Sequence, residues 1–131
     1  MKRKIFIIII FLLLLTAPGR NAFLRCQTDE NVISNIKNIP NPFRAGESTT
    51  VIRYVLSADC GVTITIYNLI GDKVIEFSET ACLSGINQRE WDGRNSLGRV
   101  VADGCYICLI TAKDDAGKTI ESEKHKIAVL K

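Results

Sequence analysis

The sequence has little of what most catalytic and metal sites require. Its 131 residues include a single histidine, His125, which lies in a charged stretch where a Ser-His-Asp triad is hard to assemble. Paired carboxylates occur only in segments that have the composition of turns or solvated faces. The ligands of a zinc site are also too few, because Cys105 and Cys108 form a C-x-x-C and no second such pair is present. We therefore predict that the protein is not an enzyme and has no catalytic residue, cofactor or bound metal.

A surplus of positive charge is also missing once the N-terminus is set aside. The chain has 17 basic and 14 acidic residues, and Lys2, Arg3 and Lys4 account for the whole difference. A balanced chain without a basic cluster lacks the electrostatic footprint of proteins that bind the phosphate backbone. We expect no nucleic-acid partner.

The one long hydrophobic run extends from Ile5 to Leu15 and follows those three basic residues. Small residues at Ala17 and Gly19 come behind it, so residues 1–19 are predicted to be a secretory signal peptide that is cleaved after Gly19. The run is well short of the roughly 20 apolar residues that cross a bilayer. The predicted location is secreted, periplasmic or at a bacterial cell surface, with membrane contact only if the leader stays uncleaved.

Behind the leader, no segment has a convincing helical period. Residues 20–31 are mostly polar and indicate a flexible lead-in, whereas the domain predicted over residues 32–131 alternates apolar and polar positions as half-buried strands do. Ile52, Tyr54 and Leu56 show this alternation, and it recurs in later segments separated by turns at 69–72, 92–98 and 114–117. The pattern predicts an all-β fold, an antiparallel immunoglobulin- or fibronectin-III-like β-sandwich of about seven strands.

Two segments depart from this regular pattern. Residues 32–39 hold apolar side chains without a clear period, which leaves their conformation open. Residues 121–126 are charged on both faces, as is typical of an edge strand that must resist aggregation.

A set of short motifs occurs in a fixed order along the domain. It consists of Asn41-Pro-Phe43, Ile52-Arg-Tyr54, Ile66-Tyr-Asn-Leu-Ile-Gly71, Trp91-Asp-Gly-Arg94, Gly98, Val101-Ala102 and Gly104-x-Tyr106. With these motifs, residues 39–131 resemble the FlgD-type immunoglobulin-like domain, named for the flagellar hook-capping protein, and are similar to the C-terminal sorting domains of type IX secretion. The resemblance implies a β-sandwich used for sorting, surface attachment or assembly, without catalytic residues.

We expect the motif residues to be structural rather than ligand-binding. Glycines suit turns with positive φ, Trp91 and Tyr106 suit a core between two sheets, and Asp92 or Asn95 can accept hydrogen bonds from nearby amides. The alternative, a calcium loop that uses Asp92, Asn95 and Ser96, lacks the carboxylate density of known loops. The motif residues with this expected structural role are Asn41, Pro42, Phe43, Tyr67, Gly71, Trp91, Asp92, Gly93, Gly98, Gly104 and Tyr106.

The five cysteines are not part of this resemblance, and in an exported chain they permit disulfides. If residues 69–72 turn between two antiparallel strands, Tyr67 faces about Val74 and Cys60 faces about Ala81, which brings Cys82 within reach. We predict a Cys60–Cys82 disulfide, with Cys105 and Cys108 reduced and buried and Cys26 free in the lead-in. The alternatives are five reduced cysteines, or a thiol-disulfide enzyme that uses Cys105 and Cys108.

The functional prediction is a non-enzymatic secreted or cell-envelope module that acts by protein–protein contact, in adhesion or extracellular assembly. Its partner, a protein or cell-surface component, is not encoded in any motif. The alternative is a C-terminal-type sorting or anchoring module for secretion to the cell surface. Such modules usually follow a large passenger, whereas only a leader precedes the domain here, and this weakens the sorting hypothesis.

Overall fold

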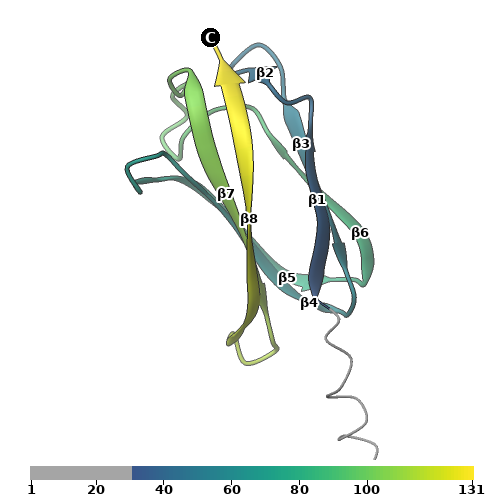
Figure 1. Ribbon diagram of the computed structural model, residues 1–131. Coiled ribbons are helices and arrows are strands. Elements are labelled where there is room, and N and C mark those ends of the chain that lie inside the picture. The colour runs from purple at the N-terminus through teal and green to yellow at the C-terminus, as the bar shows by residue number, and fades with distance from the viewer. Residues whose placement is uncertain (1–30) are drawn as a thin grey trace, which may run out of the picture. The chain divides into compact units, whose positions relative to one another are not determined.

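The computed structural model describes residues 31–131, which form eight strands and, within that range, no helix (Figure 1). The predicted signal peptide and all of the predicted lead-in except Asn31 lie outside the described residues. In the part of the chain that is described, no helix has the length and hydrophobicity to cross a membrane.

The strands are arranged in two sheets that pack face to face, and this confirms the predicted β-sandwich. The three-stranded sheet has the order β1-β3-β6, with β1 at Ile33–Ile39, β3 at Thr50–Leu56 and β6 at Gly85–Trp91. The five-stranded sheet has the order β2-β8-β7-β4-β5, with β2 at Phe43–Arg44, β8 at Thr119–Leu130, β7 at Gly104–Lys113, β4 at Cys60–Tyr67 and β5 at Lys73–Cys82. The short β2 pairs with β8 in parallel, and the other strand pairs are antiparallel.

The core lies between the sheets and follows the alternation in the sequence. Ile52, Tyr54 and Leu56 of β3 are all buried, whereas Arg53 is exposed. The same alternation fails in the middle of β4, where Thr63 and Thr65 are buried although they face outward. They are covered because β4 has paired strands on both sides, β5 and β7. Apolar patterning therefore identified the inner face correctly and underestimated the burial of the outer one.

The ambiguous segment at residues 32–39 forms β1. Its pairing with β3 is interrupted between Ser34 and Lys37, where Asn35 has a φ of 50°. Such a bulge shifts the side chains that follow to the other face. This explains why the apolar residues of the segment show no single period.

The charged strand β8 matches the edge-strand prediction over only part of its length. It pairs with β7 along its length and with β2 only at Val129 and Leu130. Within the described residues, its charged half has no strand on that second side. Glu121 instead accepts a hydrogen bond from the backbone N–H of Val32, the residue before β1. The charged half is thus an edge in its hydrogen bonding, although β2 formally ends the sheet.

Candidate functional site

Three aromatic rings fill one end of the sandwich, which we call the motif end. The ring of Trp91 meets that of Phe43 with centroids 5.5 Å apart and that of Tyr106 at 5.7 Å, both edge to face. Trp91 is 1% exposed, which confirms the predicted burial. Its Nε1–H donates to the carbonyl of Arg94 at 2.9 Å, and the hydroxyl of Tyr106 donates to the carbonyl of Ala102 at 2.7 Å. The polar atoms of both rings are therefore used inside the fold.

The loop after Trp91 is held by its own side chains. Asp92 accepts the N–H of Arg94 at 3.1 Å, and the Oδ1 of Asn95 accepts the N–H groups of Leu97 and Arg99, both at 3.0 Å. These bonds are the expected ones from nearby amides to Asp92 and Asn95. Oδ1 of Asp92 and Oδ1 of Asn95, two of the oxygen atoms that a calcium loop would need, thus accept hydrogen bonds from backbone donors. Elsewhere in residues 31–131, no group of three or more His, Cys, Asp or Glu side chains comes together as a metal site.

Gly93 allows the loop to approach Ala45, the residue after β2, closely. A Cβ built at Gly93 would lie 2.4 Å from the Cβ of Ala45 and 2.7 Å from its Cα, and the φ of Gly93 is 75°. The other motif glycines also have positive φ, as predicted, but no atom lies within 4 Å of a Cβ built on them: Gly71, Gly98 and Gly104. Among the motif glycines, Gly93 alone is required for both backbone conformation and close approach.

Asn41 connects the two sheets through a network that sequence reasoning missed. Its Oδ1 accepts the N–H of Ala128 at 2.9 Å, and its Nδ2 donates to the Oδ1 of Asn38 at 3.0 Å. The same Oδ1 of Asn38 lies 2.8 Å from Nε2 of His125, and Asn38 Nδ2 donates to Thr50. Because Asn38 and His125 are 87 residues apart, no local pattern could have indicated this contact.

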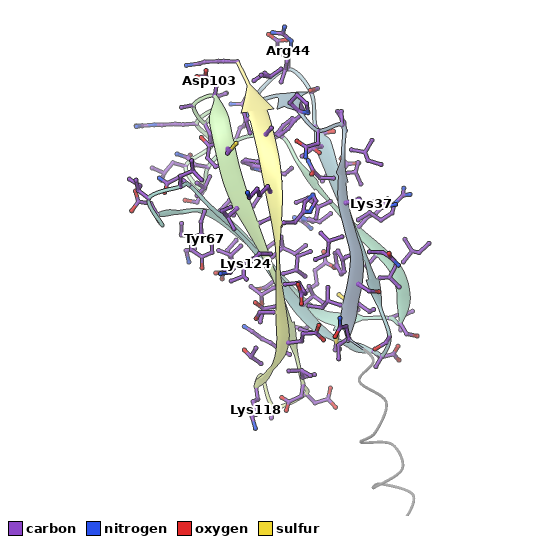
Figure 2. All side chains as sticks on the ribbon, viewed as in Figure 1. Lys37, Arg44, Tyr67, Asp103, Lys118 and Lys124 are labelled. Carbon is purple, nitrogen blue, oxygen red and sulfur yellow. The ribbon has the colours of Figure 1, made fainter. Side chains whose placement is uncertain are left out.

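Not every motif residue joins the motif end. Pro42 is exposed, and Tyr67 is half-buried opposite Ile107, on the side of the five-stranded sheet away from β1, β3 and β6 (Figure 2). Gly71 lies in the turn between β4 and β5. The motif set is therefore a mixture of core, turn and surface positions rather than one constellation.

Large apolar side chains are exposed at two loops beside the motif end. Leu69 and Ile70 are 70% and 84% exposed at the tip of the β4–β5 turn, and Leu97 is 76% exposed in the loop after Trp91. The N–H of Ser96, in the second loop, donates to the carbonyl of Val74 in β5, shortly after the β4–β5 turn. The two loops border a hollow of about 330 Å³, whose lining includes Asn68, Asp72, Leu97 and Tyr106. We call Leu69, Ile70 and Leu97 the tip surface.

The cysteines are distributed differently from the prediction in two respects. Cys60 is directly opposite Cys82 rather than Ala81, and Tyr67 is opposite Lys73 rather than Val74, because the β4–β5 pairing is irregular near both ends. Cys105 is exposed and not buried, since it lies on the outer face of β7, whereas Cys108 is buried. Cys60 and Cys82 are both buried thiols in the structure, so the disulfide between them stays a prediction.

The thiols at this second end, the cysteine end, adjoin a buried phenol. The Sγ of Cys82 lies 3.5 Å from Oε2 of Glu79, to which its S–H donates. Burial raises the pKa of Tyr54, and the neighbouring Cys82 and Glu79 raise it further. Burial also raises the pKa of Cys108 to about 12, so this thiol of the C-x-x-C stays protonated. Cys105 and Cys108 moreover lie on opposite faces of β7, one exposed and one buried, and this geometry argues against a redox pair formed by the two.

Comparison with known proteins gives a fold but no family by sequence. No protein-family model matches the chain, and no curated protein matches it either. Among solved structures, FlgD from P. aeruginosa is similar with a TM-score of 0.57 and 19% identity, over 75% of each chain. FlgD from Xanthomonas campestris has a TM-score of 0.50 and 24% identity, over 74% of this chain and 64% of that one.

A third likeness is to PorZ of Porphyromonas gingivalis, with a TM-score of 0.52 and 22% identity. It covers 74% of this chain but only 12% of PorZ, so the protein corresponds to a small part of that relative. The three likenesses bear out the resemblance seen in the motifs at the level of structure. The described chain therefore has the immunoglobulin-like sandwich fold that occurs in FlgD and PorZ.

Proposed function

We propose that the protein is a non-enzymatic, exported module that acts by protein–protein contact in an extracellular or envelope assembly. The observation that carries this proposal is the tip surface, because its large exposed apolar side chains belong to two loops that border one hollow. The similar structures support an assembly role. PorZ is described as a surface component of the type IX secretion system, and FlgD of Xanthomonas campestris as a hook-capping protein essential for flagellar assembly.

The polar chemistry of the domain supports a structural scaffold rather than an active site. In residues 31–131, no buried side-chain nitrogen or oxygen lacks a hydrogen-bond partner. The polar groups of the motif end are used within the fold, and the ring of His125 contacts an amide rather than a nucleophile. An adhesive role would use the same tip surface toward a cell-surface component.

The test compares two sets of exposed apolar residues in the source cell. Replacing Leu69, Ile70 and Leu97 by Ser should release the protein from a larger assembly after mild cross-linking of the cell envelope. The matched control replaces Leu83 and Ile86 by Ser, which are 71% and 73% exposed where β5 passes to β6, and should leave the assembly intact. Monomeric wild-type protein, or equal loss in both variants, would overturn the proposal, as would turnover of a hydrolase substrate.

Export is tested by the N-terminus of the mature protein. Cleavage after Gly19 leaves Arg20 as the first residue, and N-terminal sequencing of the exported protein should find it. Recovery of Met1 would show that the leader is retained as an anchor.

The alternative role, sorting to the cell surface, is favoured by the likeness to part of PorZ. A reporter fused to residues 31–131 keeps β1, which begins at Ile33 and would be lost in a shorter fusion. Transport of this reporter to the surface would support sorting. Retention in the periplasm, together with loss of assembly in the tip-surface variant, would support the contact role.

A further inference from the structure

Cys60 and Cys82 are arranged as a disulfide requires. Cys60 begins β4, Cys82 ends β5, and the two residues are direct cross-strand partners. Directly opposed residues of antiparallel strands have Cα atoms about 4.5–5.5 Å apart, inside the range of roughly 4.4–6.8 Å that disulfides span. Both side chains are buried in the core, 7% and 4% exposed. The backbone is therefore already placed for a bond between the two sulfur atoms.

A hollow gives access to the pair from solvent. It has a volume of about 180 Å³, and both cysteines line it together with Asp59, Ala81, Leu83 and Asp115. We propose that Cys60 and Cys82 are a thiol–disulfide couple, oxidised to an intramolecular disulfide by exchange with a small organic disulfide that enters this hollow.

The charges around the hollow select the oxidant. Asp59 and Asp115 line it, and the carboxylate of Glu79, which also pairs with Arg89, lies against the thiol of Cys82. Like charges repel and opposite charges attract at a partly exposed site, more strongly at low ionic strength. A cationic disulfide such as cystamine is thus favoured over the anionic disulfide of glutathione.

The reaction is a stoichiometric exchange. One cysteine loses its proton, and its thiolate attacks a sulfur of the disulfide R–S–S–R; a mixed disulfide forms and one thiolate leaves, to be protonated to R–SH. The thiolate of the second cysteine then attacks the mixed disulfide at the protein sulfur, which releases the second R–SH. Two electrons pass from the protein thiols to the small disulfide, and the two protons lost by the cysteines end on the two R–SH products.

The thiol environment predicts a slow reaction that speeds up with pH. Burial, then the nearby Asp59, raise the pKa of Cys60; burial, then the hydrogen bond to Glu79, raise the pKa of Cys82. Little thiolate is present at neutral pH, and thiolate is the attacking species.

Cys105 and Cys108 provide an internal control. They lie on opposite faces of β7, one exposed and one buried, with Cα atoms roughly 10 Å apart as expected for positions i and i+3 of a strand. That separation exceeds what a disulfide spans. Exposed Cys105 should form a mixed disulfide with either oxidant and no bond to Cys108.

The experiment treats the reduced mature protein with cystamine or with oxidised glutathione, at low and high salt, followed by alkylation and non-reducing peptide mapping. A Cys60–Cys82 peptide should appear several-fold faster with cystamine at low salt, and the difference should shrink at high salt. In the Cys60→Ala variant, Cys82 should stop at the mixed disulfide with cystamine. Oxidation of the wild type should raise the melting temperature by on the order of 10 °C, and the variant should show no such rise.

Two results would overturn the proposal that Cys60 and Cys82 are a thiol–disulfide couple. One is a linkage of Cys60 or Cys82 to any other cysteine in the folded protein. The other is full recovery of both as thiols after prolonged treatment well above the ordinary thiol pKa of 9.0, where thiolate is available. Equal rates with the two oxidants at low salt would overturn the charge selection. None of these three results depends on the tip surface or on any assembly, so failure of this proposal can be told apart from failure of the proposed function.

Discussion

The two ends of the sandwich are closed by different chemistry. At the motif end, Phe43, Trp91 and Tyr106 pack edge to face, and the polar atoms of the last two donate to loop carbonyls. At the cysteine end, the phenol of Tyr54 and two thiols take the place of such a cluster. The motif end holds most of the residues that carry the resemblance to FlgD-type domains. At the cysteine end, Tyr54 belongs to one of the motifs, while the two thiols lie outside that pattern.

This difference between the two ends distinguishes the residues that build the fold from those that are particular to this chain. A cluster of aromatic rings with internal hydrogen bonds needs particular large side chains, and it needs glycine where two backbone segments come close. Such a cluster therefore leaves a recognisable pattern in the sequence. Small thiols can fill a core position without special geometry. We therefore expect changes at the motif end to cost the most stability, and changes at the cysteine end to act mainly through protonation and oxidation.

The largest effect should come from Trp91→Ala. Removing a ring that is 1% exposed leaves a cavity against Phe43 and Tyr106 and should lower the free energy of unfolding by about 3–5 kcal/mol. Chemical denaturation of the purified mature protein measures this loss. A midpoint near that of the wild type would mean that the ring is not a core residue in solution, and the comparison of the two ends would fail.

The second largest effect should come from Gly93→Ala, and a control variant separates the steric contact at this position from the cost of its positive φ. Gly93→Ala should cost about 2–4 kcal/mol, because its Cβ would overlap Ala45 and its φ is positive. Gly98→Ala is the matched control, since its φ is also 75° but nothing lies within 4 Å of the added Cβ, and it should cost only about 1–2 kcal/mol. Equal losses in denaturation experiments would show that the contact with Ala45 is relieved by a small backbone shift.

The fold could be read from the sequence because its signals are local. Alternation at Ile52, Tyr54 and Leu56 indicates a strand face, and the turn formers after Trp91 indicate a loop. The bulge in β1, the one-residue shift that places Cys60 opposite Cys82, and the Asn38–His125 contact depend on partners far along the chain. The tip surface was missed for the same reason, since the loops that carry Leu69 and Leu97 come to border one hollow only in the folded chain.

A smaller effect on the free energy of unfolding should appear at high pH, where the thiols of the cysteine end lose their protons. The folded-state pKa values of Cys60 and Cys82 are raised by burial, so the folded protein holds these protons longer than the unfolded chain does. Their contribution to stability is complete below the ordinary thiol pKa of 9.0 and is lost as pH rises through their higher folded-state values. The double variant Cys60→Ala, Cys82→Ala should therefore lose stability less steeply above pH 9.0 in urea titrations. An unchanged slope would show that Tyr54, Tyr106 and Cys108 carry the alkaline response alone.

The smallest effect should come from His125, at low pH. Asn41 Nδ2 donates to Oδ1 of Asn38, which identifies that atom as an acceptor, so His125 must donate to it through Nε2–H. Protonation at Nδ1 keeps this bond but places a charge in a half-buried position, and burial accordingly lowers the pKa of His125 from 6.5 even though Glu123 lies two residues away on the same face.

A depressed pKa gives stability that is complete above pH 6.5 and is lost as pH falls through the folded-state value. Because solvent screens the half-exposed ring, the loss should stay below about 1 kcal/mol. His125→Gln keeps a donor for Asn38 but cannot titrate, so its stability should vary less than that of the wild type between pH 7 and pH 5 in urea titrations, roughly the range in which histidine changes charge. A steeper loss in the variant would mean that the imidazolium is stabilised in the fold, with Glu123 outweighing burial.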